Sequence, residues 1–304
     1  MIRDTFKTVR RWGEMVKFSH SVFALPFALL ATFLASRAAF QAGDSPQIYP
    51  SLWQFLLILG CMVSARSAAM TFNRIVDAAI DARNPRTAAR AIPAGIISPS
   101  QALVFLGVAA AAFVLCCAGF WWIERNPYPL MLSLPVLAYL CFYSYTKRFT
   151  RWSHFVLGSA IALSPPAAWL AIHPASLGWP ALILLTTVTL WIGGFDIIYA
   201  CQDIAPDQAE GLFSLPARTG VRPALWIARS AHAVTVVLLV ALAPVAGLSW
   251  LYGIGVAAVA WLLLIENAMV HPRDLSRVNT AFFTVNGIVS LLLGTLGIAD
   301  CLLL

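Results

Sequence analysis

Long apolar runs separated by short polar stretches make up most of the chain. Each run approaches the roughly 20 residues that a helix needs to cross about 30 Å of hydrocarbon. The runs lack the polar–apolar alternation of membrane-barrel strands, so they must be helices, because lipid cannot satisfy backbone polar groups. The pattern predicts nine transmembrane helices, at residues 21–40, 52–76, 101–122, 129–145, 154–172, 180–200, 229–247, 250–269 and 280–303.

The composition agrees with an all-α polytopic membrane bundle. Hydrophobic residues make up 60% of the 304 positions and charged residues 11%, whereas soluble domains are about one quarter charged. No linker or low-complexity segment divides the chain, so we expect a single domain over residues 1–304. Residues 1–20 would form a cytoplasmic or interfacial segment, with an interfacial helix at 10–19, and residues 21–304 the bundle.

The basic residues predict the orientation in the membrane. With nine spans, 17 of the 20 Lys and Arg residues lie on the side of the N-terminus, and only Arg37, Arg125 and the intramembrane Arg66 do not. Because cytoplasmic segments carry the excess of Lys and Arg, the N-terminus is predicted to be cytoplasmic and the C-terminus to lie on the opposite side of a plasma (inner) membrane. The net charge of +7 needs no nucleic acid to explain it, since topology and anionic lipid suffice.

Acidic residues gather in two places. Two connections are long, about 77–100 and about 201–228, and each opens with two aspartates four residues apart. Both connections are predicted to be cytoplasmic and to form a cap over the bundle. The two pairs are Asp77 with Asp81 and Asp203 with Asp207.

Each pair extends a polar stripe of a spanning helix. Residues three or four apart share a helix face, and this spacing predicts one stripe on the second span and another on the sixth. Pro206 should kink or end the sixth span, so Asp207 would approach from a turn. The stripes consist of Arg66, Met70, Asn73, Asp77 and Asp81, and of Asp196, Tyr199, Asp203 and Asp207.

We expect the two acidic ends to face one another and to bind a hard divalent cation. Four converging carboxylates would repel one another without a cation between them. Carboxylate oxygens suit Mg²⁺, which usually binds through one or two carboxylates together with substrate phosphate oxygens. The basic residues nearby would then bind a diphosphate, with Arg86 and Arg90 as the predicted ligands.

Such a site, opening into lipid, predicts a lipid diphosphate as the substrate. With an isoprenoid chain, metal binding would assist departure of the diphosphate, and an electron-rich acceptor would attack the allylic carbon within apolar walls that exclude water. A cation-coupled transporter is the alternative. It predicts charged groups near the bilayer centre rather than at the ends of spans, and it has no use for the arginine cluster.

The motifs resemble those of the UbiA superfamily of intramembrane aromatic prenyltransferases. "NRIVDAAID" is similar to the first family motif, NDxxDxxxD, and "DIIYACQDIAPDQAEGLFSLPARTG" resembles the second, YAxxDxxxDxxxG. "YTKRFTRWSHFVLG" is similar to the segment after the fourth span. The matching residues are Asn73, Asp77 and Asp81, then Tyr199, Asp203, Asp207 and Gly211, and finally Lys147 and Arg66.

The resemblance implies Mg²⁺-dependent transfer of a polyprenyl group to a hydroxylated aromatic carboxylate in quinone synthesis. The four aspartates would bind metal, Lys147 would join Arg86 and Arg90 at the diphosphate, and Arg66, Asn73, Asp196 and Tyr199 would contact substrate. Beyond membrane lipid and the two substrates, it implies neither nucleic acid nor an obligate protein partner. Arg74 replaces the first acid of the first motif, which leaves the number of metal ions open.

The acceptor remains open between several aromatic compounds. The NR variant, "KFSHSVFALPFAL" and "NPRTAAR" resemble the 4-hydroxybenzoate polyprenyltransferase-like subgroup, often assigned to the futalosine route to menaquinone, where 1,4-dihydroxy-6-naphthoate would be the acceptor. 4-Hydroxybenzoate, homogentisate, haem and chlorophyll-type acceptors, or a terpene cyclisation, are the alternatives. Outside the motifs, we interpret His154 and His232 as interfacial or packing residues and Glu266 as an interfacial charge.

Overall fold

The computed structural model describes residues 12–16 and 23–303. Within these ranges the chain is helical and forms no β-strand beyond one isolated bridge between His271 and Asp274. Residues 12–15 are helical, inside the predicted interfacial helix. The predictions for residues 1–11 and 17–22, which include the first two residues of the first predicted span, lie outside the described residues.

In the described part of the chain, nine helical segments are long and apolar enough to cross a membrane. This confirms the nine spans predicted from the sequence. They are α2 (Leu25–Ala42), α3 (Leu52–Val76), α5 (Pro99–Glu124), α6 (Tyr128–Thr146), α7 (Ser153–Ala162) with α8 (Ser164–Ile172), α9 (Trp179–Ala200), α12 (Val221–Val245), α13 (Trp250–Met269), and α14 (Val278–Thr280) with the π-helix η3 (Ala281–Val285) and α15 (Asn286–Leu303). Short helices between them are α4 (Ala78–Arg83), η2 (Pro174–Ser176), α10 (Ile204–Ala209) and α11 (Leu215–Thr219).

Local sequence explains where several helices begin and break. Ser98 and Gln101 form a capping box before α5, and Pro99 occupies the first turn, where no backbone N–H is needed. The fifth span breaks at Leu163 because Pro165 and Pro166 have no N–H to continue the helical hydrogen bonds. The Ser164 hydroxyl donates instead to the Ile161 carbonyl, at 2.8 Å.

The seventh span is longer than predicted. Helix α12 begins at Val221, whereas the apolar run suggested a start at residue 229. Arg222 and Arg229 interrupt the hydropathy but are good helix formers, so the helix continues through them. Arg229 Nη2 donates to the Asn267 carbonyl at 3.3 Å and lies over the Trp226 ring.

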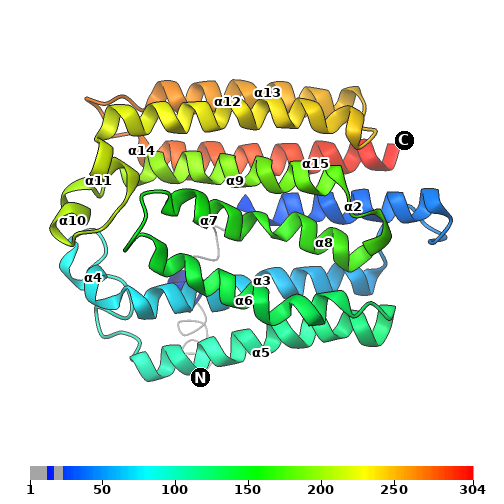
Figure 1. Ribbon diagram of the computed structural model, residues 1–304, viewed down its shortest axis with the longest axis horizontal. Coiled ribbons are helices and arrows are strands. Elements are labelled where there is room, and N and C mark those ends of the chain that lie inside the picture. Colours follow the sequence, from blue (N-terminus) through cyan, green and yellow to red (C-terminus); the bar gives the residue numbers. More distant parts are fainter. Residues whose placement is uncertain (1–11, 17–22, 304) are drawn as a thin grey trace, which may run out of the picture. The chain divides into compact units, whose positions relative to one another are not determined.

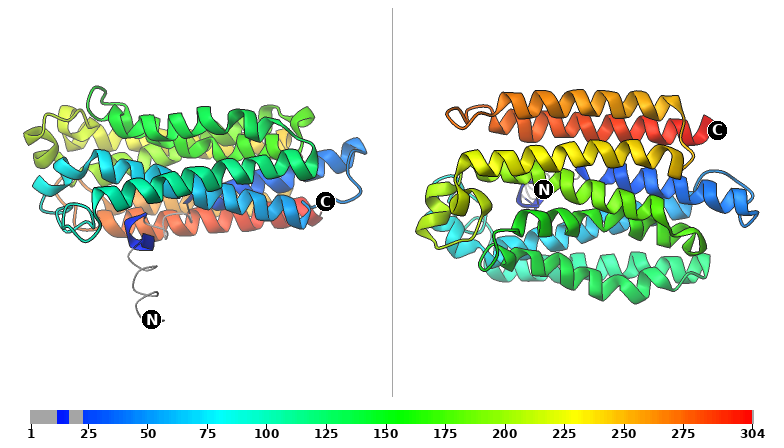
Figure 2. Two further views of the ribbon diagram at one scale, coloured as in Figure 1. Left: turned by 90° about the horizontal axis from the view of Figure 1, so that it is seen from below. Right: turned by 45° about the horizontal axis from the view of Figure 1, so that its top comes forward.

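The described helices divide into two compact units, one containing residues 12–16 and 59–145 and the other residues 23–58 and 146–303. In the first unit, α3, α5 and α6 run alongside one another (Figure 1). In the second unit, α9 packs against α7 and α12, and α15 packs against α13 and α2 (Figures 1 and 2). The single domain predicted from the sequence stays a prediction.

Glycines allow α7 and α9 to approach closely. A Cβ atom added at Gly158 would lie 2.4 Å from the Thr189 carbonyl oxygen, and one at Gly193 would lie 2.5 Å from the Phe155 ring. Small residues are typical of closely packed membrane helices. This contact fixes α7 beside α9. Helix α7 carries His154, and α9 carries Asp196 shortly before the second aspartate motif.

Glu266 is fully buried, so its interpretation as an interfacial charge was wrong. Its side chain is 0% exposed, and its Oε1 accepts a 2.8 Å hydrogen bond from Asn286 Nδ2. Asn286 Oδ1 in turn accepts from the Trp191 indole N–H at 2.8 Å. The carboxyl therefore ties α9, α13 and α15 together, a role that hydropathy alone does not reveal because the partners lie far apart in sequence.

Candidate active site

The first aspartate motif lies at the junction of α3 and α4. Helix α3 ends at Val76 and α4 begins at Ala78, yet the helical hydrogen bonds continue, from Asp77 N to Asn73 O at 2.9 Å and from Asp81 N to Asp77 O at 2.8 Å. Asn73, Asp77 and Asp81 therefore share one face, as their spacing predicts.

Both carboxylates of this motif are buried and make charge-assisted contacts. Asp77 is 2% exposed and accepts a 3.0 Å hydrogen bond from Asn73 Nδ2. Asp81 is 4% exposed, and both its oxygens accept from Arg90 Nη1, at 2.6 and 2.7 Å. Arg74 Nη1 lies 4.0 Å from Asp81. Because a buried charge is tolerated only when it is paired, these arginines stabilise the motif.

The other predicted residues of the first unit are placed differently. Arg66 lies within electrostatic reach of Arg74 and of Tyr143 on α6. Arg86 is exposed, and its backbone N–H donates to Asn84 Oδ1 at 3.0 Å. Arg90, one of the predicted diphosphate ligands, therefore contacts Asp81 directly, and it occupies oxygens that a metal ion could also use.

The second motif is not an extension of α9, which corrects the predicted stripe on the sixth span. Helix α9 ends at Ala200, three residues before Asp203, and Asp203 instead precedes the short helix α10. Asp207 N donates to Asp203 O at 2.8 Å, so the two aspartates are one helical turn apart, Asp203 at the N-cap of α10 and Asp207 in its first turn. Pro206 is accommodated there because it lies in the first turn of α10.

Charged groups surround Asp207. Burial raises the pKa of its carboxyl above the ordinary value, and the Asp203 charge adds to this shift. The positive charge of Lys147 acts in the opposite direction. The structure therefore brings Lys147, the predicted diphosphate ligand after the fourth span, into electrostatic reach of the second aspartate pair.

Asp196 and Tyr199 lie on the last two turns of α9. Asp196 Oδ2 is 2.7 Å from His154 Nδ1, and the Asp196 side chain is 22% exposed. The Tyr199 ring packs against Phe282, with centroids 4.3 Å apart, and against Phe283 in the π-helix. Segments of π-helix frequently occur at functional sites.

Three side chains beside the motifs have neighbours that the sequence did not predict. Tyr143 and Ser144 lie next to the first motif, Ser144 Oγ being 3.4 Å from Asn73 Nδ2 and Tyr143 within electrostatic reach of Asp77. His154, interpreted above as an interfacial or packing residue, forms a hydrogen bond with Asp196. Their position close to Lys147 in the sequence was the signal that could have drawn attention to them.

The donor chemistry of each motif fits a magnesium ion. Among the described residues, no group of three or more His, Cys, Asp and Glu side chains could by itself hold a metal ion. Each motif nevertheless offers two carboxylates, and Mg²⁺ usually takes one or two from a protein when phosphate oxygens complete its coordination. Oxygen ligands without sulfur or imidazole also favour Mg²⁺ over softer metals.

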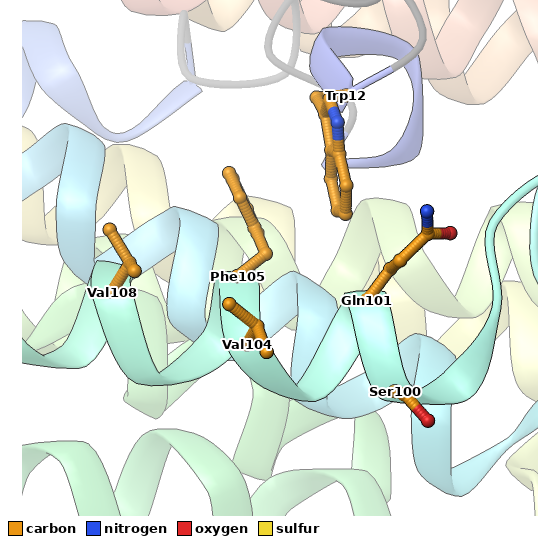
Figure 3. Close-up of a pocket in the computed structure, with 6 residues that line it drawn as sticks. All are labelled: Trp12, Ser100, Gln101, Val104, Phe105 and Val108. Carbon is orange, nitrogen blue, oxygen red and sulfur yellow. The ribbon is translucent and has the colours of Figure 1, made fainter.

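An open groove in the first unit has a different character. It is lined by Trp12, Ser100, Gln101, Val104, Phe105 and Val108, and the Trp12 and Phe105 rings stack with centroids 4.5 Å apart (Figure 3). None of the described residues that line it is charged. Its described lining is mostly apolar, whereas the carboxylates and arginines that suit a metal and a diphosphate lie at the aspartate motifs, where we place the candidate site.

Comparison with known proteins decides the family. The model of the UbiA prenyltransferase family matches residues 24–288. The chain belongs to this family. It is therefore a multi-pass membrane enzyme of the prenyltransferase class, and the family resemblance stated from the motifs is confirmed.

Relatives and solved structures agree with this assignment. The chain is 27% identical over 271 residues to the 4-hydroxybenzoate octaprenyltransferase of Pseudoalteromonas atlantica, covering 84% of this chain and 91% of that protein. It is 30% identical over 220 residues to the protein of the same name from Hydrogenovibrio crunogenus, covering 67% and 74%.

Among solved structures, a UbiA homolog from Aeropyrum pernix K1 in its apo form superposes with a TM-score of 0.79 at 30% identity, covering 92% of this chain and 98% of that chain. A UbiA homolog from Archaeoglobus fulgidus bound to GPP and Mg²⁺ shares the fold, with a TM-score of 0.66 at 19% identity, covering 97% of this chain and 100% of that chain.

Proposed function

We propose that this prenyltransferase transfers a polyprenyl group from polyprenyl diphosphate to a hydroxylated aromatic carboxylate in an Mg²⁺-dependent reaction of quinone synthesis. The observation that carries the proposal is the two pairs of aspartates, each on one helical turn and each accompanied by a basic residue. Curated relatives act, by their names, on 4-hydroxybenzoate.

In this proposal Asp77, Asp81, Asp203 and Asp207 bind the metal. Magnesium, when bound, neutralises charge on the diphosphate and assists its departure as a Lewis acid. Both oxygens of Asp81 accept from Arg90, so coordination of a metal by Asp81 would compete with these hydrogen bonds. The Arg90 guanidinium would bind the diphosphate, since its planar fork of donors suits phosphate oxygens.

The remaining residues bind and orient the substrates. Arg86 and Lys147 supply further positive charge to the diphosphate, and Lys147 does so from beside Asp207. Arg66, Asn73, Asp196 and Tyr199 orient the two substrates. Arg74, buried beside Asp81, takes the place of an acid of the family motif and leaves this motif with two carboxylates.

The proposed location follows from the distribution of Lys and Arg. The protein lies in the plasma membrane as one domain, with its N-terminus and both aspartate motifs on the cytoplasmic side. The polyprenyl chain and the prenylated product then stay in the lipid phase, whereas the released diphosphate and the small aromatic acceptor exchange with the cytoplasm.

Purified protein incubated with radiolabelled polyprenyl diphosphate and a panel of acceptors tests this function. We expect prenylated product with 4-hydroxybenzoate or 1,4-dihydroxy-6-naphthoate, and a loss of product on chelation with EDTA that added Mg²⁺ restores, because the diphosphate needs its charge neutralised to leave. Homogentisate serves as the competing acceptor. Product formation that persists in EDTA, or label that is transferred to neither predicted acceptor, would contradict the proposal.

A further inference from the structure

The His154 imidazole uses both ring nitrogens. Nδ1 lies 2.7 Å from Asp196 Oδ2, and Nε2 lies 3.3 Å from the backbone nitrogen of Leu215. A backbone N–H can only donate, so Nε2 must be the acceptor, and Nδ1 must carry the proton that is donated to Asp196. These two contacts fix the tautomer and the ring orientation of a side chain that is 5% exposed.

One ring thereby connects three elements of the second unit. His154 is the second residue of α7, Asp196 lies on α9 one turn before its end, and Leu215 begins α11. A further hydrogen bond, from Phe213 N to the Lys147 carbonyl at 2.7 Å, holds the same stretch against the segment that precedes α7. Leu215 itself is buried, at 1% exposure.

The contacts of His154 lie at the two ends of a segment that contains the second aspartate motif. Asp203 and Asp207 lie between Asp196 and Leu215 in the chain. Holding both ends of a loop restricts the positions that its middle can sample, and catalytic groups must be held closely to be effective. We propose that His154 is a positioning residue, which fixes Asp203 and Asp207 for binding of the metal–diphosphate substrate. This inference rests on the proposed function.

A packing role would need only the volume of the ring, whereas the proposed role needs one donor and one acceptor. Substitutions can separate the two. Glutamine offers an amide N–H for Asp196 and a carbonyl oxygen for Leu215 N, while leucine fills similar space and offers neither. His154→Gln should therefore retain the function that His154→Leu loses.

Steady-state kinetics at controlled amounts of folded enzyme provide the first readout. For His154→Leu we expect the KM for polyprenyl diphosphate and the Mg²⁺ concentration at half-maximal rate to rise about tenfold, the effect of losing one hydrogen bond to a charged group. His154→Gln should restore both to within about threefold of the original protein. His271→Ala, in an exposed loop, is the control for histidine removal.

Hydrogen–deuterium exchange provides a second readout that needs no activity. Exchange of the Leu215 amide and of the peptides covering residues 196–215 should accelerate in His154→Leu and return toward the original rate in His154→Gln. Unchanged KM, Mg²⁺ dependence and exchange in His154→Leu, or a glutamine variant no better than the leucine variant, would overturn the inference. If the unsubstituted protein shows no Mg²⁺-dependent prenyl transfer, the proposed function is refuted. The exchange rates would still test whether His154 holds residues 196–215 in place.

Discussion

Replacing Asp77 or Asp203 with alanine is expected to lower turnover of polyprenyl diphosphate on the order of 10³-fold, because each change removes an oxygen ligand that stabilises charge on the leaving diphosphate. One aspartate comes from each motif, so the pair of variants tests whether both motifs serve the same reaction. Rates are to be measured with saturating acceptor and Mg²⁺, on protein shown to be folded by its thermal unfolding curve in detergent.

Two further variants make this result specific. Asp77→Asn keeps the shape of the buried side chain beside Asn73 and removes its charge, so it should be inactive without a large loss of stability. Asp274→Asn is the matched control, since Asp274 lies in an exposed loop and its oxygen accepts from Ser276 N, which an amide oxygen can also do. Nearly full activity in Asp77→Ala or Asp203→Ala would contradict the assigned roles.

Gly158→Ala is expected to destabilise the protein by about 1–3 kcal/mol, the usual cost of overpacking. The added methyl group would lie 2.4 Å from the Thr189 carbonyl oxygen and 3.1 Å from Gly193 N, both backbone atoms that cannot rotate away. Helices α7 and α9 would have to separate. Because α7 carries His154 and α9 carries Asp196, prenyl transfer should fall as well.

Gly253→Ala is the same chemical change at a helical position where nothing lies within 4 Å of the new methyl group. The intrinsic helix preference for alanine over glycine, about 1 kcal/mol, applies at both sites. Gly253→Ala should thus be neutral or slightly stabilising, and the difference between the two variants isolates the helix contact. Equal unfolding temperatures for both variants would show that α7 and α9 do not pack as described.

The spans were predictable because each is encoded locally, by a run of apolar residues long enough to cross a bilayer. The residues at which the helices begin and end were less predictable. Arg222 lowers the hydropathy of a segment that is still helical, and α9 ends before Asp203 although the three- and four-residue spacing continues. Spacing identifies residues that can share a face, but hydrogen bonds decide where a helix stops.

The candidate site was predictable where chemistry lies in short motifs, as with Asn73, Asp77 and Asp81. It was not predictable where partners are distant or belong to the backbone. His154 binds a carboxylate 42 residues away and a backbone amide 61 residues away, and a backbone donor leaves no trace in the sequence. Glu266 was misinterpreted for a similar reason, since Asn286 and Trp191 become its neighbours only in the fold.

The central proposal is that the two aspartate motifs bind the same metal–diphosphate substrate. An experimental structure with an unreactive polyprenyl thiodiphosphate and Mn²⁺ in place of Mg²⁺, located by anomalous scattering, tests it most directly. We expect carboxylate oxygens from both motifs around ions that also contact the diphosphate, at about 2.0–2.6 Å. Metal bound by one motif alone, with the other more than about 15 Å away and beyond any shared ion, would contradict it.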